Sequence, residues 1–108
     1  MFEGNKVELK MEKAIIMNSV LDEETHVCKV LRYNPEEDYI RLLLDKEELQ
    51  VMQLDAKYKC DIITKAEVLT CTGVIKERFR DENGNVMIFK IENGFYSSKN
   101  LEEKISIK

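Results

Sequence analysis

The chain has 108 residues, of which 44% are hydrophobic and 35% are charged, with four glycines and one proline. This length suits one domain with one modest core, and the content of apolar residues excludes a disordered chain. The formal net charge of −4 disfavours non-specific binding to nucleic acid or to anionic membranes.

The segment from 6 to 20 has two interpretations. Val7, Met11 and Ile15 are loosely in phase for a helix, but the same residues also fit two short strands that break near Glu12 and Lys13. The first twenty residues lack the apolar core and cleavage site of a signal peptide. No uninterrupted apolar run approaches the ~20 residues of a spanning helix. We therefore expect a soluble, cytoplasmic protein with no membrane insertion.

Alternation of apolar and polar residues is the strongest signal in the chain, and it predicts half-buried strands. The expected strands cover residues 26–33, 39–45, 58–64, 66–80 and 86–92. Their inward faces carry Ile40, Leu42, Leu44, Tyr58, Cys60, Ile62, Met87, Phe89 and Ile91.

Turn residues separate these strands. Asn34-Pro35 begins one turn, and two Asn-Gly pairs, at 83–84 and 93–94, are typical of further turns. The pair at 83–84 predicts an antiparallel hairpin. Asp45 to Leu49 has the capping pattern of one helical turn. Residues 97–108 form a tail or a last strand, with Ile105 and Ile107 in alternation.

These elements predict a single mainly β domain over residues 1–108, a small antiparallel barrel or split barrel of six to seven strands with little helix.

The inventory of reactive side chains argues against an enzyme. His26 is the one histidine, and it fits an ordinary position at the start of a strand. Cys28, Cys60 and Cys71 are widely spaced without a CxxC pair, which is typical of reduced, buried thiols. The acidic clusters at 21–25, 35–38 and 45–49 lack the spacing and the glycine of a calcium loop. We expect no catalytic residues, no bound metal and no cofactor.

Three cations form what we call the basic ladder: Lys76, Arg78 and Arg80. Side chains two residues apart on a strand share a face, so the ladder spans ~13 Å and could hold a phosphate. A plain solvent-exposed face explains the same pattern. Either interpretation turns Phe79 toward the core, although Glu77 interrupts that apolar face and indicates a bulge or a sheet edge.

The second half of the chain resembles a known family. The run YKCDIITKAEVLTCTGVIKERFR, a turn, and then VMIFKIENGFY resembles the N-terminal split-barrel domain of bacterial PilZ-type flagellar-brake proteins (PilZN-like). The similar features are an aromatic strand start at Tyr58, a glycine-containing strand at Gly73 and the basic-aromatic segment KERFR. The resemblance covers about residues 6–96. It implies a regulatory accessory barrel that acts through a protein partner or a second copy of itself.

The motifs with which PilZ domains bind cyclic di-GMP are missing here. That family uses RxxxR followed by (D/N)xSxxG, whereas Arg78-Phe79-Arg80 has the wrong spacing and no (D/N)xSxxG occurs. Cyclic di-GMP is therefore not expected as a ligand.

Two functions are in view. One is a non-catalytic protein-interaction module. The other is a small-ligand sensor that binds a phosphorylated molecule or nucleotide through the basic ladder. A nucleic-acid-binding barrel is disfavoured, since the total charge is acidic and basic and aromatic positions do not interleave on the other strands.

Overall fold

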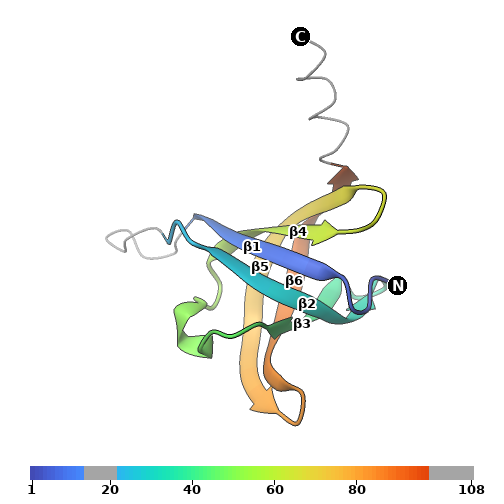
Figure 1. The fold of residues 1–108 in the computed structure, drawn as a ribbon. Helices are drawn as coiled ribbons and strands as arrows, with labels where there is room; N and C mark the ends of the chain where they lie inside the picture. The colour runs from blue at the N-terminus through green and yellow to red at the C-terminus, as the bar shows by residue number, and fades with distance from the viewer. Residues whose placement is uncertain (14–21, 98–108) are drawn as a thin grey trace.

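The computed structural model describes residues 1–13 and 22–97, and these form one closed antiparallel barrel (Figure 1). The strands are β1 (Lys6–Lys13), β2 (Thr25–Asn34), β3 (Tyr39–Leu44), β4 (Lys57–Ile63), β5 (Val68–Asp81) and β6 (Gly84–Ser97). Their order around the barrel is β1-β2-β3-β6-β5-β4, with β4 pairing back to β1. The prediction of a mainly β antiparallel barrel with little helix is confirmed.

The core fills the inside of the barrel, and period-two alternation explains which side chains reach it. All nine residues expected on the inward faces of β3, β4 and β6 are buried. Strand β1 adds Val7, Leu9 and Met11. The first part of the 6–20 segment is thus a strand and not a helix, while the expectations for residues 14–21 and for the tail from 98 onward fall outside the described residues.

The hairpin of β5 and β6 is present, but its turn lies one residue earlier than predicted. Asp81 pairs with Gly84, so Glu82 and Asn83 occupy the turn. The backbone N–H of Asn83 donates to the Asp81 carboxylate at 2.8 Å. Gly84, and not a turn residue, has the positive φ angle. Asn93 and Gly94 do not form a turn, because β6 continues through both of them.

The segment between β3 and β4, residues 45–56, covers one end of the barrel; we call it the covering segment. A helical turn at 45–49 was expected, but the helical piece is a 3-10 turn, η1 (Leu49–Val51). Lys46 has a φ of 61°, which interrupts a right-handed turn at 45–49. Met52 and Ala56 are fully buried and close the core at this end. Within residues 1–13 and 22–97, no helix has the length and apolarity to cross a membrane.

Candidate ligand-binding groove

A bulge in β5 decides which way its basic residues face. Ile75 pairs with Phe89 and Glu77 pairs with Ile88, so Lys76 is an extra residue in the strand. Arg78 then lies opposite Met87, a core residue, and Phe79 lies on the outer face of the barrel. The prediction that Phe79 points into the core is therefore wrong. In the sequence, the bulge is indicated by Glu77, a charged residue on a face of the strand that is otherwise apolar.

The side chains of the basic ladder are exposed, as predicted, and they contact the protein itself. The prediction that Arg78 and Arg80 lie on the outer face of the hairpin is wrong, because both share the face of the core residue Met87. Lys76 forms a salt bridge with Asp55 of the covering segment at 3.1 Å. The Arg78 guanidinium donates to the backbone carbonyl of Leu49 at 3.3 Å and to that of Met52. These two cations therefore fasten the covering segment to the hairpin.

Arg80 continues the same connection indirectly. Its guanidinium donates to the side-chain oxygen of Asn85 at 3.1 Å, and the Asn85 amide donates to the carbonyl of Glu47 at 2.9 Å. These contacts are all within the protein, so the binding of a ligand by the basic ladder stays a prediction.

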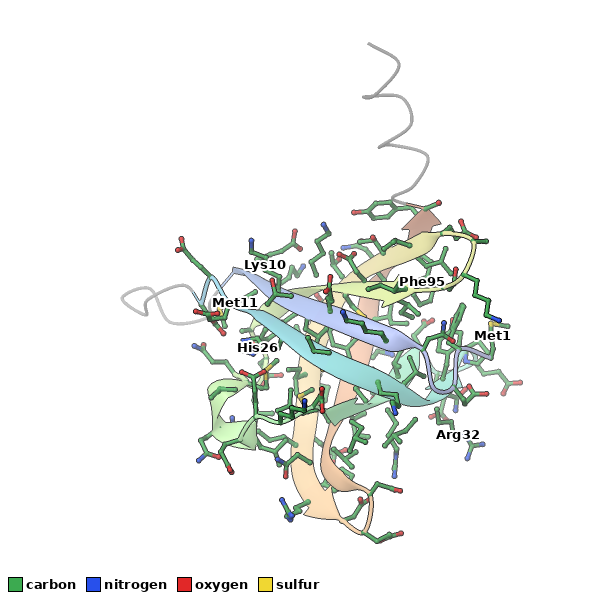
Figure 2. All side chains as sticks on the ribbon, in the orientation of Figure 1. Met1, Lys10, Met11, His26, Arg32 and Phe95 are labelled. Carbon is green, nitrogen blue, oxygen red and sulfur yellow. The ribbon has the colours of Figure 1, made fainter. Side chains whose placement is uncertain are left out.

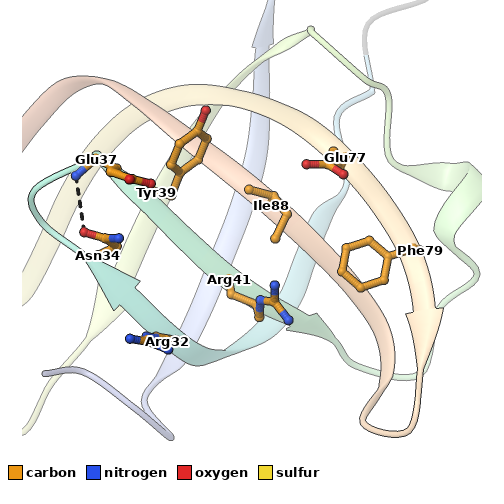
Figure 3. A pocket seen from close by; sticks show the side chains of 8 residues that line it. All are labelled: Arg32, Asn34, Glu37, Tyr39, Arg41, Glu77, Phe79 and Ile88. Atoms are coloured by element: carbon orange, nitrogen blue, oxygen red, sulfur yellow. Dashed lines mark hydrogen bonds between the residues drawn. The ribbon is translucent and has the colours of Figure 1, made fainter.

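A groove of about 590 Å³ crosses the outer face of strands β2, β3, β6 and β5 (Figure 3). One row of directly paired residues runs through it: Arg32 opposite Arg41, Arg41 opposite Ile88, and Ile88 opposite Glu77. We call this the groove row. It is basic at one end, apolar in the middle and acidic at the other end.

Aromatic side chains border the groove row on both sides. The Arg41 guanidinium lies 5.7 Å from the centre of the Phe79 ring, and Figure 3 shows its side chain between those of Arg32 and Phe79. The Lys90 ammonium lies 4.8 Å from the centre of the Tyr39 ring. These contacts hold two cations against aromatic faces without neutralising their charge.

The turn between β2 and β3 sets the two arginines opposite each other. The Asn34 side-chain oxygen accepts hydrogen bonds from the amides of Glu36 and Glu37, at 3.1 and 3.2 Å, and this fixes the chain reversal. Asn34 then pairs with Tyr39, and Arg32 pairs with Arg41 further along the strands. The pair therefore follows from the tight turn and the register that it starts.

The arginine pair differs from the other like-charge pairs in the barrel. Like charges directly opposite each other on neighbouring strands destabilise a sheet. In the described residues neither Arg32 nor Arg41 makes a salt bridge. Lys6 also faces another lysine, but it has Glu8 at 3.6 Å, and Lys59 likewise has Asp61 at 3.8 Å. Two exposed arginines directly opposite each other on neighbouring strands can both reach one oxyanion.

A second polar cluster surrounds His26 at the end of the barrel near the covering segment (Figure 2). The ring is 2% exposed, with Nδ1 2.8 Å from a Glu47 oxygen and Nε2 2.5 Å from an Asp22 oxygen. Burial lowers the pKa of His26, but hydrogen bonds to Asp22 and Glu47 outweigh it, so the pKa is raised above its usual value. The carboxylates lie at opposite ring nitrogens, so the ring cannot direct both onto one metal ion.

The cysteines lie inside the barrel. Cys28, Cys60 and Cys71 are free and buried, and Cys60 lies directly opposite Cys71 on strands β4 and β5. Burial raises the pKa of the Cys28 thiol well above its usual value, which keeps it protonated. In the part of the chain that the structure describes, no group of three or more His, Cys, Asp and Glu side chains could hold a metal ion.

Sequence reasoning did not single out Arg32 and Arg41. A signal was present in the spacing around the turn at 34–38, because a hairpin through that turn brings residues 32 and 41 together. The bulge between Val30 and Arg32 lies beyond the pair as counted from the turn, so it leaves this register unchanged.

Comparisons with known proteins add no relative: no family model, no curated protein and no solved structure matches this chain. The resemblance to PilZN domains therefore stays a prediction that depends on the residues quoted for it. What the chain does must be argued from the groove itself.

Proposed function

We propose that this protein is a non-catalytic interaction module that binds an anionic surface of a protein partner through its outer groove. The observation that carries the proposal is the directly opposed pair of Arg32 and Arg41, neither of which makes a salt bridge among the described residues. The pKa of one exposed carboxyl, that of Glu3, is lowered mainly by a hydrogen bond from the N-terminal ammonium group, and the charge of Arg32 helps to lower it. Such a pair costs stability in the free protein and is relieved when an anion binds between the two guanidiniums.

The shape of the groove favours a protein partner over a small molecule. Small-molecule sites usually enclose most of their ligand, whereas this groove lies open across four strands with both arginines exposed. Strands β3 and β6, which carry the middle of the groove row, are paired on both sides there, so a partner that lies over them must be recognised by side chains.

The resemblance to PilZN domains supports a regulatory role in a bacterial cytoplasm, since that family implies an accessory barrel that contacts a partner or a second copy. A small-ligand sensor based on Lys76, Arg78 and Arg80 is our second candidate. We rank it lower because Lys76 and Arg78 already contact Asp55 and two carbonyls of the covering segment.

A charge reversal in the groove tests the proposal. Tagged wild-type protein, Arg41→Glu and Lys10→Glu would each be used to capture proteins from a lysate of the source cell. Lys10 is an exposed cation on β1, outside the groove, and serves as the matched control. We expect wild type and Lys10→Glu to retain the same partners and Arg41→Glu to lose them. Equal capture by all three would contradict the proposal.

A second arm identifies self-association. Sedimentation of the same three proteins would show a dimer of wild type that Arg41→Glu abolishes if the partner is a second copy. A dimer that survives Arg41→Glu would mean that copies associate elsewhere.

A further inference from the structure

We propose that the groove binds an extended protein segment in which an acidic residue and an apolar residue are two positions apart. This inference rests on the proposed function and names the chemistry of the partner. The acidic side chain would lie between Arg32 and Arg41, and the apolar side chain would lie over Ile88 beside Phe79.

The spacing of the groove row matches the spacing of an extended chain. Neighbouring strands are ~4.8 Å apart, so the midpoint between Arg32 and Arg41 is ~7 Å from Ile88 along the row. Side chains at positions i and i+2 of an extended segment point the same way and are also ~7 Å apart. The whole row from Arg32 to Glu77 spans ~14 Å, which is the length of about four extended residues.

The charges of the row fix which end of it takes the acidic side chain. Arg32 and Arg41 attract a carboxylate at one end, and Glu77 repels one at the other end. A segment with its acidic residue over Ile88 would place that carboxylate beside Glu77 and leave the two arginines unpaired. The row therefore selects one placement of an acidic-x-apolar segment over the shifted one.

Arg41 is held ready for this contact. Its guanidinium already lies against the Phe79 ring at 5.7 Å, so little side-chain freedom is lost when it binds a carboxylate. Ile88 is half-buried in the groove and offers the apolar contact next to it.

The same charges disfavour a nucleic acid, even though the folded barrel does bring basic and aromatic side chains together. Glu37 and Glu77 both line the groove and would face the regularly spaced phosphates of a single strand. One isolated carboxylate avoids both of them.

The test uses a labelled peptide, Gly-Ser-Glu-Ser-Leu-Ser-Gly, and the full 108-residue protein. Binding would be measured by fluorescence polarisation, and the site would be mapped by backbone amide shifts. The comparison peptides replace Glu by Gln, replace Leu by Ser, or place Leu directly after Glu. The protein variants are Arg32→Gln, Arg41→Gln and, as the control, Lys10→Gln.

We expect the peptide to bind less tightly as salt is added, and its binding to change the amide chemical shifts most around Arg41 and Ile88. Each arginine variant should bind the peptide about fivefold less tightly than wild type. Lys10→Gln should bind as wild type does, and each altered peptide should bind less well. Amide spectra of the variants would confirm that they are folded.

Three results would overturn the inference: no binding of the first peptide, equal binding of the adjacent Glu-Leu peptide, or tighter binding of an eight-nucleotide thymidine strand at the same amides. If lysate partners still depend on Arg41 while the peptide fails, the interaction function stands and only the acidic-x-apolar chemistry is wrong. If both fail, the groove is not an interaction surface.

Discussion

His26 Nδ1 lies 2.8 Å from a carboxylate oxygen of Glu47, and this contact joins the start of β2 to the covering segment. Nε2 of the same ring lies 2.5 Å from Asp22. A neutral imidazole has one N–H, so the ring can donate to both carboxylates only when it is protonated. The cluster therefore stabilises the folded protein most when the His26 ring is protonated.

The raised pKa of His26 means that its contribution is complete below about pH 6.5 and is lost as the pH rises through the higher folded value. For Asp22, burial raises the pKa, but the hydrogen bonds from His26 and from the Glu24 backbone amide, together with the charge of His26, outweigh it and the pKa is lowered. That contribution is present above about pH 4 and is lost as the pH falls through the lowered value.

We expect wild type to be more stable than His26→Gln by about 2 kcal/mol near pH 6, with the difference shrinking toward pH 9. Urea unfolding followed by circular dichroism across this range measures it. A difference that grows with pH would show that the ring is neutral in the folded protein.

Arg78 and Arg80 should differ in their effect on stability, although the sequence pattern treats them alike. Arg78→Ala removes the hydrogen bonds to the carbonyls of Leu49 and Met52, and we expect a cost of about 1–2 kcal/mol. Arg80→Ala should stay within about 0.5 kcal/mol. Hydrogen exchange of the covering segment should speed up in the first variant and not in the second. Equal behaviour would mean that Arg78 does not hold this segment.

Phe79 and Phe89 form a matched pair that tests the bulge. Phe89 is fully buried in the core, whereas Phe79 is half-buried on the outer face. We expect Phe89→Ala to cost about 3–5 kcal/mol and Phe79→Ala about 1 kcal/mol. Urea midpoints with unchanged slopes would measure both. If Phe79→Ala cost as much stability as Phe89→Ala, Phe79 would have to lie in the core, and β5 could not have the bulge at Lys76.

Gly73 allows a close approach between β5 and β6. A Cβ at this position would lie 2.0 Å from the backbone oxygen of Lys90, which cannot move away without breaking the sheet. Gly73→Ala should therefore destabilise the protein by about 3 kcal/mol or more. Gly94 has no atom within 4 Å of the same position, so Gly94→Ala should stay within about 0.5 kcal/mol. Thermal unfolding compares the two, and equal melting temperatures would contradict this packing.

The class of fold follows from local pattern, because Ile40, Leu42 and Leu44 alternate so clearly that only one face can be buried. The bulge at Lys76 does not follow from it. A single extra residue reverses every side chain after it, and the local sequence registers this only as Glu77 on an apolar face. This one residue explains why Phe79 and the two arginines were all assigned to the wrong side of the strand, although both arginines are exposed as predicted.

The groove was harder to predict than the fold, since its parts come from four strands. Arg32 and Arg41 meet only when β2 and β3 pair in one register, and Ile88 and Glu77 join them only when the barrel closes. The burial of His26 between Asp22 and Glu47 depends likewise on loops far apart in sequence. The sequence shows that these side chains are present, but their proximity depends on strand pairing and loop positions that it does not specify.

The arginine pair should lower the stability of the free protein while it provides a site for an anion. Because Arg32 and Arg41 face each other and neither makes a salt bridge among the described residues, removing one charge relieves their repulsion. We expect Arg32→Gln to leave stability unchanged or to raise it by up to about 0.5 kcal/mol, with the gain larger at low salt than at high salt. Lys59→Gln, which gives up the contact with Asp61, is the matched control and should bring no gain. Urea unfolding at two salt concentrations measures both variants. A clear loss of stability in Arg32→Gln would mean that this arginine supports the fold, and the proposed binding site would then lose the observation on which it depends.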